Sequence, residues 1–349
     1  MKRLYIFIFL SLPIYLFAQQ DIHFSQYNNS PLTLNPASAG AFEGKMRFLT
    51  NYRNQWNSIN SPFKTFSGSF DMPIKMDRKK YGNNFVGLGV NVYNDKAGDS
   101  NFNTFKIAGN VDYAIDMGGT LKNPHFLSVG IGIGFLQRNL NVDNVNWESQ
   151  WDGTRFSPSL QSQEKLKGEQ SEGDVDLAIG GYWYYSIDDY RRLILGLSAL
   201  HANAPDVGVF SNNHDLFRKY VFTGSMVIAD KNSNIKYTPS LMAAFHGPNL
   251  LINAGAEAEF ALQQKTESTN YKNGLSFALG GYYRWKDAVY FVTKVNYSNV
   301  SLGLSYDFTV SQLRIANKSR GGFELFLGYR INDDSKDPKR QKLKNSKGL

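Results

Sequence analysis

Histidines and serines are the residues of this 349-residue chain that could do metal or nucleophilic chemistry. The five histidines are His23, His125, His201, His214 and His246. None stands in an HExxH or another close metal-ligand spacing. The chain has no cysteine, which excludes disulfides and thiolate metal sites. We therefore predict no metal site and no cofactor, and we expect the histidines to be ordinary loop or strand-end residues. His201 and His246 should place a polar tip at a membrane interface.

Serine catalysis has no local signature in this sequence. A GxSxG nucleophile elbow is absent. The run GIGIG at Gly130 to Gly134 lacks both the GxGxxG spacing and the helix that dinucleotide loops require. It alternates with isoleucine as a strand does, so we interpret it as a glycine track on an inner face. A serine and a histidine that meet only in space remain an alternative.

Carboxylates occur in pairs that could do acid–base work. Asp174 and Asp176 are two residues apart, as are Glu257 and Glu259, so each pair shares one face of an extended strand. By the same parity further acidic residues point to the inner face, together with basic residues that could pair with them. The acidic ones are Asp71, Asp307 and Glu324, and the basic ones are Arg47, Arg53, Lys294 and Arg330.

The elements that carry these residues show strict two-residue alternation. Between positions 299 and 308, Val300, Leu302 and Leu304 point one way, whereas Asn299 and Ser301 point the other. The same pattern recurs at 85–92, 127–135 and 323–330. No segment has the period of a long amphipathic helix, so helical and α/β folds are excluded.

Runs bounded by turn residues define fourteen expected strands. They are 44–56, 62–73, 83–93, 101–116, 125–140, 173–186, 191–201, 215–230, 236–246, 249–261, 273–285, 287–297, 299–309 and 321–332. An even number of strands, 14% aromatic residues, 31 glycines and a mean hydropathy of −0.38 are typical of one class. We predict an all-β fold, a transmembrane antiparallel β-barrel of about 14 strands. Inside such a barrel, the carboxylates and bases form a charge-paired network in preference to an acid–base site or a selective pore.

Composition divides the chain into four parts. Residues 1–18 have the basic start, apolar run and terminal Ala18 of a signal peptide removed near that alanine. Residues 19–43 are a polar, aromatic segment on the periplasmic side, plug-like, which could tuck into the barrel mouth. Its apolar anchors would be Phe24, Tyr27, Leu32 and Leu34. Residues 44–332 form the barrel and 333–349 a basic tail, with no recognisable nucleic-acid motif in a secreted chain.

Long connections join odd to even strands, at 141–172, 202–214 and 310–320, and these face outward if both termini are periplasmic. The aromatic residues Trp147, Trp151, Phe156 and Phe210 lie in them. They are candidate partner-binding anchors, as Phe24 and Tyr27 are in the segment before the barrel. Self-packing of a long loop is the alternative for the tryptophans.

Several blocks of the sequence resemble the PorP/SprF family of outer-membrane proteins in the type IX secretion system of Bacteroidetes. They are HFSQYNNSPLTLNPASAGAFEG, NYRNQW and SFD near the start, GDVDLAIGGYWYY and LILGLSALHANAP in the middle, and GLSYDFTVSQLRIANKSRGGFELFLGYR at the end. The resemblance spans roughly 21–331. Ile22 stands where the family pattern would have proline, and the basic tail is longer than usual.

The resemblance implies a non-enzymatic, integral outer-membrane component that supports secretion or surface attachment of cargo adhesins, with gliding motility as one outcome. The implied partners are an adhesin or its C-terminal sorting domain, membrane lipid, and periplasmic components such as a peptidoglycan-binding lipoprotein, with no nucleic acid. The family has no catalytic residues to transfer. A porin or diffusion channel is the alternative, and an outer-membrane hydrolase a weaker one.

Overall fold

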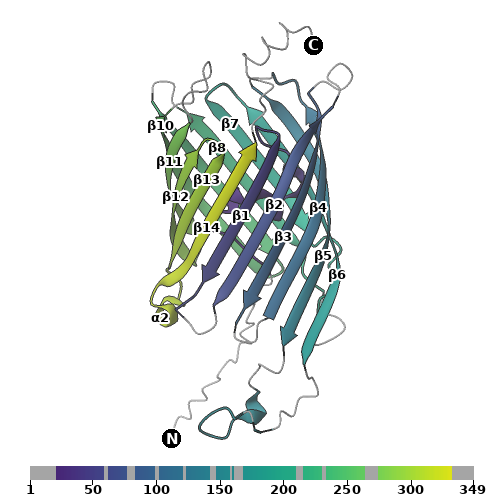
Figure 1. Cartoon of the computed structure of the whole chain (residues 1–349), viewed down its shortest axis with the longest axis vertical. Helices are drawn as coiled ribbons and strands as arrows, with labels where there is room; N and C mark the ends of the chain where they lie inside the picture. The colour runs from purple at the N-terminus through teal and green to yellow at the C-terminus, as the bar shows by residue number, and fades with distance from the viewer. Residues whose placement is uncertain are drawn as a thin grey trace, which may run out of the picture.

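The computed structural model describes 21–58, 62–76, 83–98, 102–120, 123–141, 147–157, 159–160, 168–209, 215–229, 233–263 and 274–331. The described residues form fourteen strands, each antiparallel to its neighbours in the chain, and β1 pairs with β14 to close the barrel (Figure 1). Among these residues, no helix is long and apolar enough to cross a membrane. The predicted fold class and strand number are confirmed.

The strands follow the expected runs closely. They are β1 (Met46–Gln55), β2 (Phe63–Lys75), β3 (Phe85–Ala97), β4 (Phe102–Asp116), β5 (His125–Asn141), β6 (Glu169–Ser186), β7 (Arg191–Leu200), β8 (Lys219–Ala229), β9 (Ile235–His246), β10 (Asn249–Gln263), β11 (Leu275–Arg284), β12 (Ala288–Tyr297), β13 (Val300–Thr309) and β14 (Arg320–Ile331). The largest differences at a strand start are in β6, which begins four residues earlier than predicted, and in β8, which begins four residues later. The polar start of β6 pairs with the end of β5, Asn141 opposite Glu169. The β5–β6 hairpin therefore extends past its neighbours at the lower end of Figure 1.

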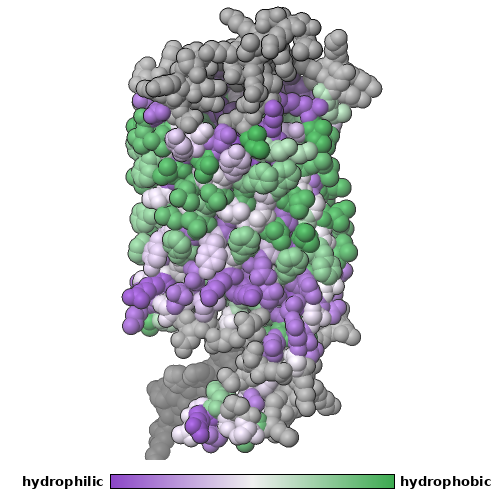
Figure 2. All heavy atoms as spheres, in the orientation of Figure 1, coloured by the Kyte–Doolittle hydropathy of each residue, from purple (hydrophilic) through white to green (hydrophobic). Residues whose placement is uncertain are grey.

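The outer wall is apolar because alternate side chains of every strand face away from the lumen. Val129, Ile131 and Ile133 of β5 are 61%, 53% and 57% exposed, whereas Gly130 and Gly132 face inward. Figure 2 shows the result on one face of the barrel as a band rich in hydrophobic residues, with hydrophilic residues below it. This band is the surface that meets hydrocarbon.

The barrel has two ends, which we name by their features. At the terminal end β1 begins and β14 finishes, and the Lys45 amide donates to the Ile331 carbonyl. At the opposite, loop end lie the one-turn helix α2 (Arg314–Asn317) and the 3₁₀ turn η5 (Glu148–Gln150) (Figure 1). Odd-numbered strands run from the terminal end to the loop end.

The segment ahead of β1 lies inside the lumen, and we call residues 21–41 the plug. It contains three 3₁₀ turns, η1 (Tyr27–Asn29), η2 (Pro31–Thr33) and η3 (Pro36–Ser38). Proline opens η2 and η3, where its missing N–H and fixed φ cost nothing, and the Asn35 side chain caps η3 by accepting from the Ala37 amide. These turns make the segment shorter than an extended chain, so the barrel wall can pack against it on both sides.

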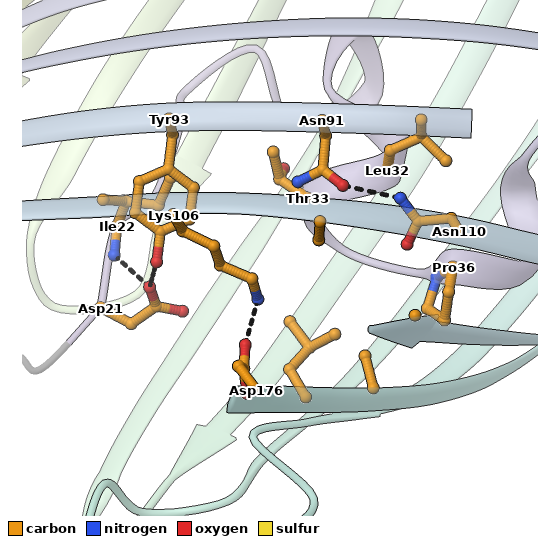
Figure 3. Close-up of a pocket in the computed structure, with 14 residues that line it drawn as sticks. Asp21, Ile22, Leu32, Thr33, Pro36, Asn91, Tyr93, Lys106, Asn110 and Asp176 are labelled. Carbon is orange, nitrogen blue, oxygen red and sulfur yellow. Dashed lines mark hydrogen bonds and ion pairs between the residues drawn. The ribbon is translucent and has the colours of Figure 1, made fainter. Parts of the chain in front are cut away.

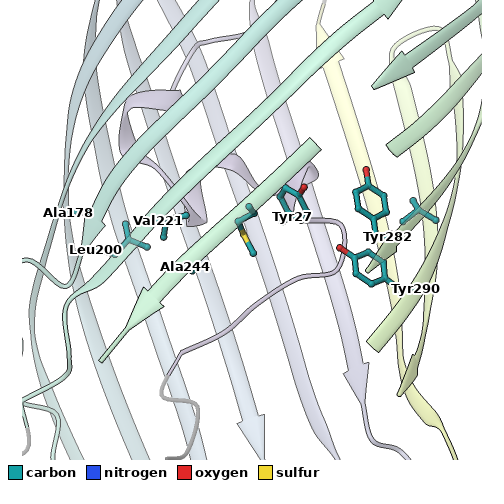
Figure 4. Close-up of a cluster of buried hydrophobic side chains, with 9 residues drawn as sticks. Tyr27, Ala178, Leu200, Val221, Ala244, Tyr282 and Tyr290 are labelled. Carbon is teal, nitrogen blue, oxygen red and sulfur yellow. The ribbon is translucent and has the colours of Figure 1, made fainter. Parts of the chain in front are cut away.

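A cluster of buried apolar side chains joins the plug to the wall. Tyr27 is 2% exposed and belongs to one buried cluster with residues of β6 to β9, β11 and β12 (Figure 4). The other members of the cluster are Ala178, Leu200, Val221, Met242, Ala244, Tyr282, Tyr290 and Val292. A second buried cluster, of Tyr93, Leu136, Val207 and Leu216, packs against Ile22 of the plug on the other side, so the core lies between the plug and the barrel wall.

Candidate functional site

The plug begins in a charged cluster near the loop end of the lumen (Figure 3). The carboxylate of Asp21 lies 2.6 Å from the Lys219 ammonium and 3.5 Å from Nε2 of His201. The other ring nitrogen of His201 lies 2.9 Å from Asp176, and Asp176 is also paired with Lys106. Five ionisable groups from the plug and four different strand regions therefore share one buried network.

Burial raises the pKa of Asp21, but Lys219 and His201 outweigh it and hold that pKa well below its usual value. Burial lowers the pKa of His201, yet its bonds to Asp176 and Asp21 outweigh burial and the net pKa is raised. Both groups therefore favour their charged forms, as opposite charges in contact should.

Backbone amides of the plug bind carboxylates of the wall in the next part of the lumen. The amides of Ser25 and Gln26 donate to the two oxygens of Glu324 at 2.7 and 3.0 Å. The Ser25 hydroxyl donates to Asp307 at 2.7 Å. Arg53 lies 2.9 Å from Asp307 and 3.3 Å from Glu324. A second arginine, Arg284, also contacts Asp307.

Tyr27 makes the polar contact in the middle of the plug. Its hydroxyl donates to the Ser240 hydroxyl at 3.0 Å. Burial raises the pKa of Tyr27 to about 12, so the group stays neutral. Beside it Tyr282 donates to Glu257, which is also paired with Lys294 at 2.9 Å. The Glu257–Lys294 pair of the wall is therefore connected, through Tyr282, to the Ser240 hydroxyl that Tyr27 contacts.

The last part of the plug is held through one side chain and through its backbone. The side-chain amide of Asn35 donates from Nδ2 to the backbone carbonyls of Gly181 and Leu197 at 2.9 and 3.2 Å. The Gly40 amide donates at 2.8 Å to Asp71, whose carboxylate also accepts two bonds from Arg47 at 2.9 and 2.7 Å. Charged groups of the wall thus bind main-chain atoms of the plug, which fixes its path.

Inward glycines leave the space that the plug fills. A Cβ at Gly130 would lie 2.6 Å from Cα of Ala37, and one at Gly87 would lie 2.1 Å from the Ala39 carbonyl oxygen. Such contacts are impossible, so any side chain at these positions displaces the plug. The glycine track predicted at 130–134 therefore faces inward, and Gly130 and Gly132 leave room for Ala37 and Pro36 of the plug.

The plug extends further than the sequence suggested. The prediction placed it at the mouth where β1 begins, whereas in the structure it continues through the lumen until Asp21 meets His201, just after the end of β7. Two cavities beside it measure only about 20 and 10 Å³. A third, of about 760 Å³, lies between the plug and the terminal end.

The six predicted partner-binding residues fall into separate places. Phe24 and Tyr27 are buried in the lumen, so they anchor the plug and present no surface. Trp151 and Phe156 pack on each other with ring centroids 5.0 Å apart, yet remain 48% and 46% exposed. Trp147 precedes η5 in the same hairpin and is partly exposed. Phe210 lies outside the described residues.

The charge network was predicted in part. Arg47, Arg53 and Lys294 pair with carboxylates as expected, but Lys106 and Lys219 were missed. The interpretation of His201 and His246 as interfacial tips was wrong, since both are buried in the lumen. No local signal marks them, because their neighbours come from distant strands and from the plug.

Nothing in the described residues groups three metal-ligating side chains. The histidines His23, His125 and His201 contact Arg53, Trp183 and two aspartates respectively, and none of these contacts is with a serine. The geometry of the site is that of a bound segment, held by ion pairs and main-chain hydrogen bonds.

Solved structures with similar folds share little sequence with this chain. The translocator domain of the autotransporter NalP from Neisseria meningitidis is 11% identical with a TM-score of 0.41, over 88% of this chain and 94% of that one. A FadL homologue from Pseudomonas aeruginosa is 10% identical with a TM-score of 0.40, over 85% and 93%. A deltaS2S3 mutant of the TodX monoaromatic hydrocarbon channel is 10% identical with a TM-score of 0.48, over 87% and 94%. No curated protein matches the chain.

A family model matches residues 16–329, which is most of the chain and includes the plug and all of the barrel except the last two residues of β14. Its description is the type IX secretion system membrane protein PorP/SprF. The family model therefore covers both parts of the site, the inserted segment and the wall that holds it. This chain belongs to the PorP/SprF family of type IX secretion system membrane proteins.

Proposed function

We propose that this integral outer-membrane barrel supports the secretion or surface attachment of adhesins that carry a C-terminal sorting domain, and that it does so without enzymatic chemistry. The family and the fold support a secretion-system component of the outer membrane. The observation that carries the finer proposal is the plug. A barrel whose lumen holds its own chain acts through the surfaces at its two ends.

The two ends would meet different partners. Bacterial barrels have short turns on the periplasmic side and longer connections outside, so the loop end would face outside, and the terminal end, where β1 begins and β14 finishes, the periplasm. The β5–β6 hairpin extends furthest at the loop end and carries Trp147, Trp151 and Phe156, which suits it to hold an adhesin. Periplasmic machinery, such as a peptidoglycan-binding lipoprotein, would meet the terminal end. Gliding motility would follow where the adhesin is a motility adhesin.

The two alternatives have less support. A diffusion channel needs a lumen open along its length, and the plug occupies this one. A hydrolase needs an activated nucleophile, and the histidine contacts described above are with other groups.

The test replaces the three hairpin aromatics together, as Trp147→Ser/Trp151→Ser/Phe156→Ser, in the full chain in its own bacterium. We expect the cell-attached share of the adhesin to fall roughly tenfold or more, because aromatic anchors dominate protein interfaces. Immunoblots of cells and medium measure this share, and heat-modifiable migration of the barrel shows that it is folded.

The matched control is Glu148→Ser/Arg155→Ser, which changes the same hairpin without removing aromatics. The Arg155 side chain is 84% exposed, so its loss should change little. If the adhesin stays attached in the aromatic triple variant while the barrel is folded, the hairpin does not hold cargo.

A further inference from the structure

The cavity of about 760 Å³ between the plug and the terminal end, which we call the vestibule, has the size of a ligand site. Its inner end is formed by plug residues, among them Tyr27, Asn35 and Gly40. Six basic and four acidic side chains line it, so the lining carries an excess of positive charge. Aromatic rings, including Tyr182 and Tyr184, contribute apolar surface.

The acidic residues of the vestibule are already occupied. They pair as Glu43 with Arg192 at 3.2 Å, Glu257 with Lys294 at 2.9 Å, Glu259 with Lys236, and Asp116 with the Asn83 amide at 2.8 Å. Three of the four carboxylates therefore have a basic partner, and the fourth, Asp116, accepts hydrogen bonds from neutral groups. A cation at any of the first three would have to displace a lysine or arginine.

Two arginines face this space side by side. Arg47 of β1 stands directly opposite Arg330 of β14 in the strand register. Asp71 engages Arg47 with two hydrogen bonds. For Arg330 the described residues supply no carboxylate partner, and its guanidinium lies 5.9 Å from the ring centroid of Phe42.

Arg330 is exposed and lines the vestibule. The Phe42 ring centroid lies 4.4 Å from the Arg47 guanidinium and 5.9 Å from that of Arg330. A Cβ at Gly44 would come within 3.1 Å of Cγ of Arg330, so the chain passes close to the arginine stem. A guanidinium fork with no carboxylate partner among the described residues can bind a carboxylate through two parallel hydrogen bonds.

We propose that the vestibule binds an acidic, extended peptide segment of a second protein, with one of its carboxylates on Arg330. Positive excess charge favours an acidic ligand, and the aromatic lining and the volume suit several residues of peptide better than a lone ion. The placement of that second protein in the periplasm rests on the proposed function.

A ligand in the vestibule would touch the plug itself. Arg47 lies 3.5 Å from the Ser38 carbonyl, and the carboxylate of Asp71 binds the Gly40 amide. The Arg47–Asp71 pair therefore connects the arginine neighbouring the ligand to the end of the plug. A ligand bound on the periplasmic side would therefore change the contacts of Ser38 and Gly40 before those of the rest of the plug.

The experiment measures peptide binding to the purified full-length barrel in detergent by calorimetry. The probe is a short synthetic peptide of alternating aspartate and serine with blocked ends, and the comparison peptide has asparagine in place of aspartate. We expect the acidic peptide to bind and the amide peptide to bind far more weakly. Arg330→Gln should weaken the acidic peptide at least about tenfold, because a hydrogen bond to a charged group is lost.

The matched control is Arg320→Gln. It removes the same charge from the same strand, but Arg320 is the first residue of β14 and lies at the loop end. Equal binding by wild type and Arg320→Gln, with loss in Arg330→Gln, supports the site. Equal binding by all three proteins, or no binding to the wild type, overturns it.

Other occupants would also be revealed. If inorganic phosphate binds as tightly as the acidic peptide, the site recognises any oxyanion and the peptide assignment fails. If removal of residues 332–349 raises peptide affinity tenfold or more, the chain's own tail fills the vestibule and the second protein is excluded. None of these results depends on adhesin attachment, so failure here and failure of the proposed function are separable.

Discussion

The outer wall and the lumen of this barrel are built from the same strands, because alternate residues of each strand face opposite sides. On the wall, Val129, Ile131 and Ile133 are more than half exposed and need only be apolar. In the lumen, Arg53 and Glu324 are 2% and 1% exposed and each needs a particular partner. The wall therefore tolerates substitution within a class, whereas the lumen depends on individual contacts.

The physical reason is the medium that each face meets. Lipid chains accept any apolar side chain at similar cost, so packing on the wall is not specific. A buried charge, by contrast, is tolerated only when its partners and hydrogen bonds are complete. The plug provides some of those partners, which makes the lumen a folded core built from parts distant in sequence.

The largest expected effect comes from breaking the central ion network. Arg53→Ala leaves the carboxylates of Asp307 and Glu324 buried without their shared guanidinium. We expect the free energy of unfolding to fall by about 3–5 kcal/mol, measured by urea unfolding in detergent.

The wall provides the control for this experiment. Ile133→Leu changes an exposed apolar side chain of β5 and should cost less than about 1.5 kcal/mol. Equal losses in both variants would mean that lumen and wall obey the same rule, and the contrast between them would fail.

A smaller effect should follow from filling the space reserved for the plug. Gly130→Leu places a side chain where Cα of Ala37 lies, so the η3 part of the plug must move. Overpacking of this kind costs about 1–3 kcal/mol. Planar-bilayer recordings should show more frequent or larger open current than the wild type, because the lumen loses part of its filling.

The control variant is Gly109→Leu on β4, a glycine whose Cβ would meet a single atom, at 4.0 Å. It adds the same side chain without touching the plug. If both variants leave the current at the wild-type level, displacement of η3 does not open the lumen.

The smallest effect is a dependence of stability on pH that comes from the charged end of the plug. The folded pKa of Asp21 is below its usual 3.8, so its contribution is complete above that pH and is lost as pH falls through the folded pKa. The folded pKa of His201 is above 6.5, so its contribution is complete below that pH and is lost as pH rises through the folded pKa.

We therefore expect the urea midpoint of the wild type to decline when pH is raised above 6.5, and the decline to shrink in His201→Gln. Titration of wall residues shared by both proteins cancels in this comparison. An identical pH profile for the two proteins would show that His201 does not bind the plug in its charged form.

Much of the fold could be predicted because alternation is a local property. The alternation within each of the fourteen runs predicts a strand, and the turn residues on either side predict where that strand ends, without information from the rest of the chain. The exception is instructive. The start of β6 is polar and does not alternate, so only its pairing with the end of β5 makes it a strand.

For the candidate site, the sequence predicted only which residues face the inside of the barrel, because that depends on their alternation along each strand. Arg47, Arg53 and Lys294 were expected on the inner face with acidic partners, and the structure places them there. His201 could not be foreseen in its network, because Asp21 and Asp176 reach it from the plug and from β6.

The sequence by itself determined that alternate residues face lipid, that the chain forms a barrel, and that inner charges come in both signs. A two-residue period carries that information at every strand, since it depends only on neighbouring positions. Tertiary structure alone decided that residues 21–41 run through the lumen, and which carboxylate each base meets. Those choices depend on ring closure between β1 and β14 and on the space left by inward glycines, and no local pattern encodes distances across a closed lumen.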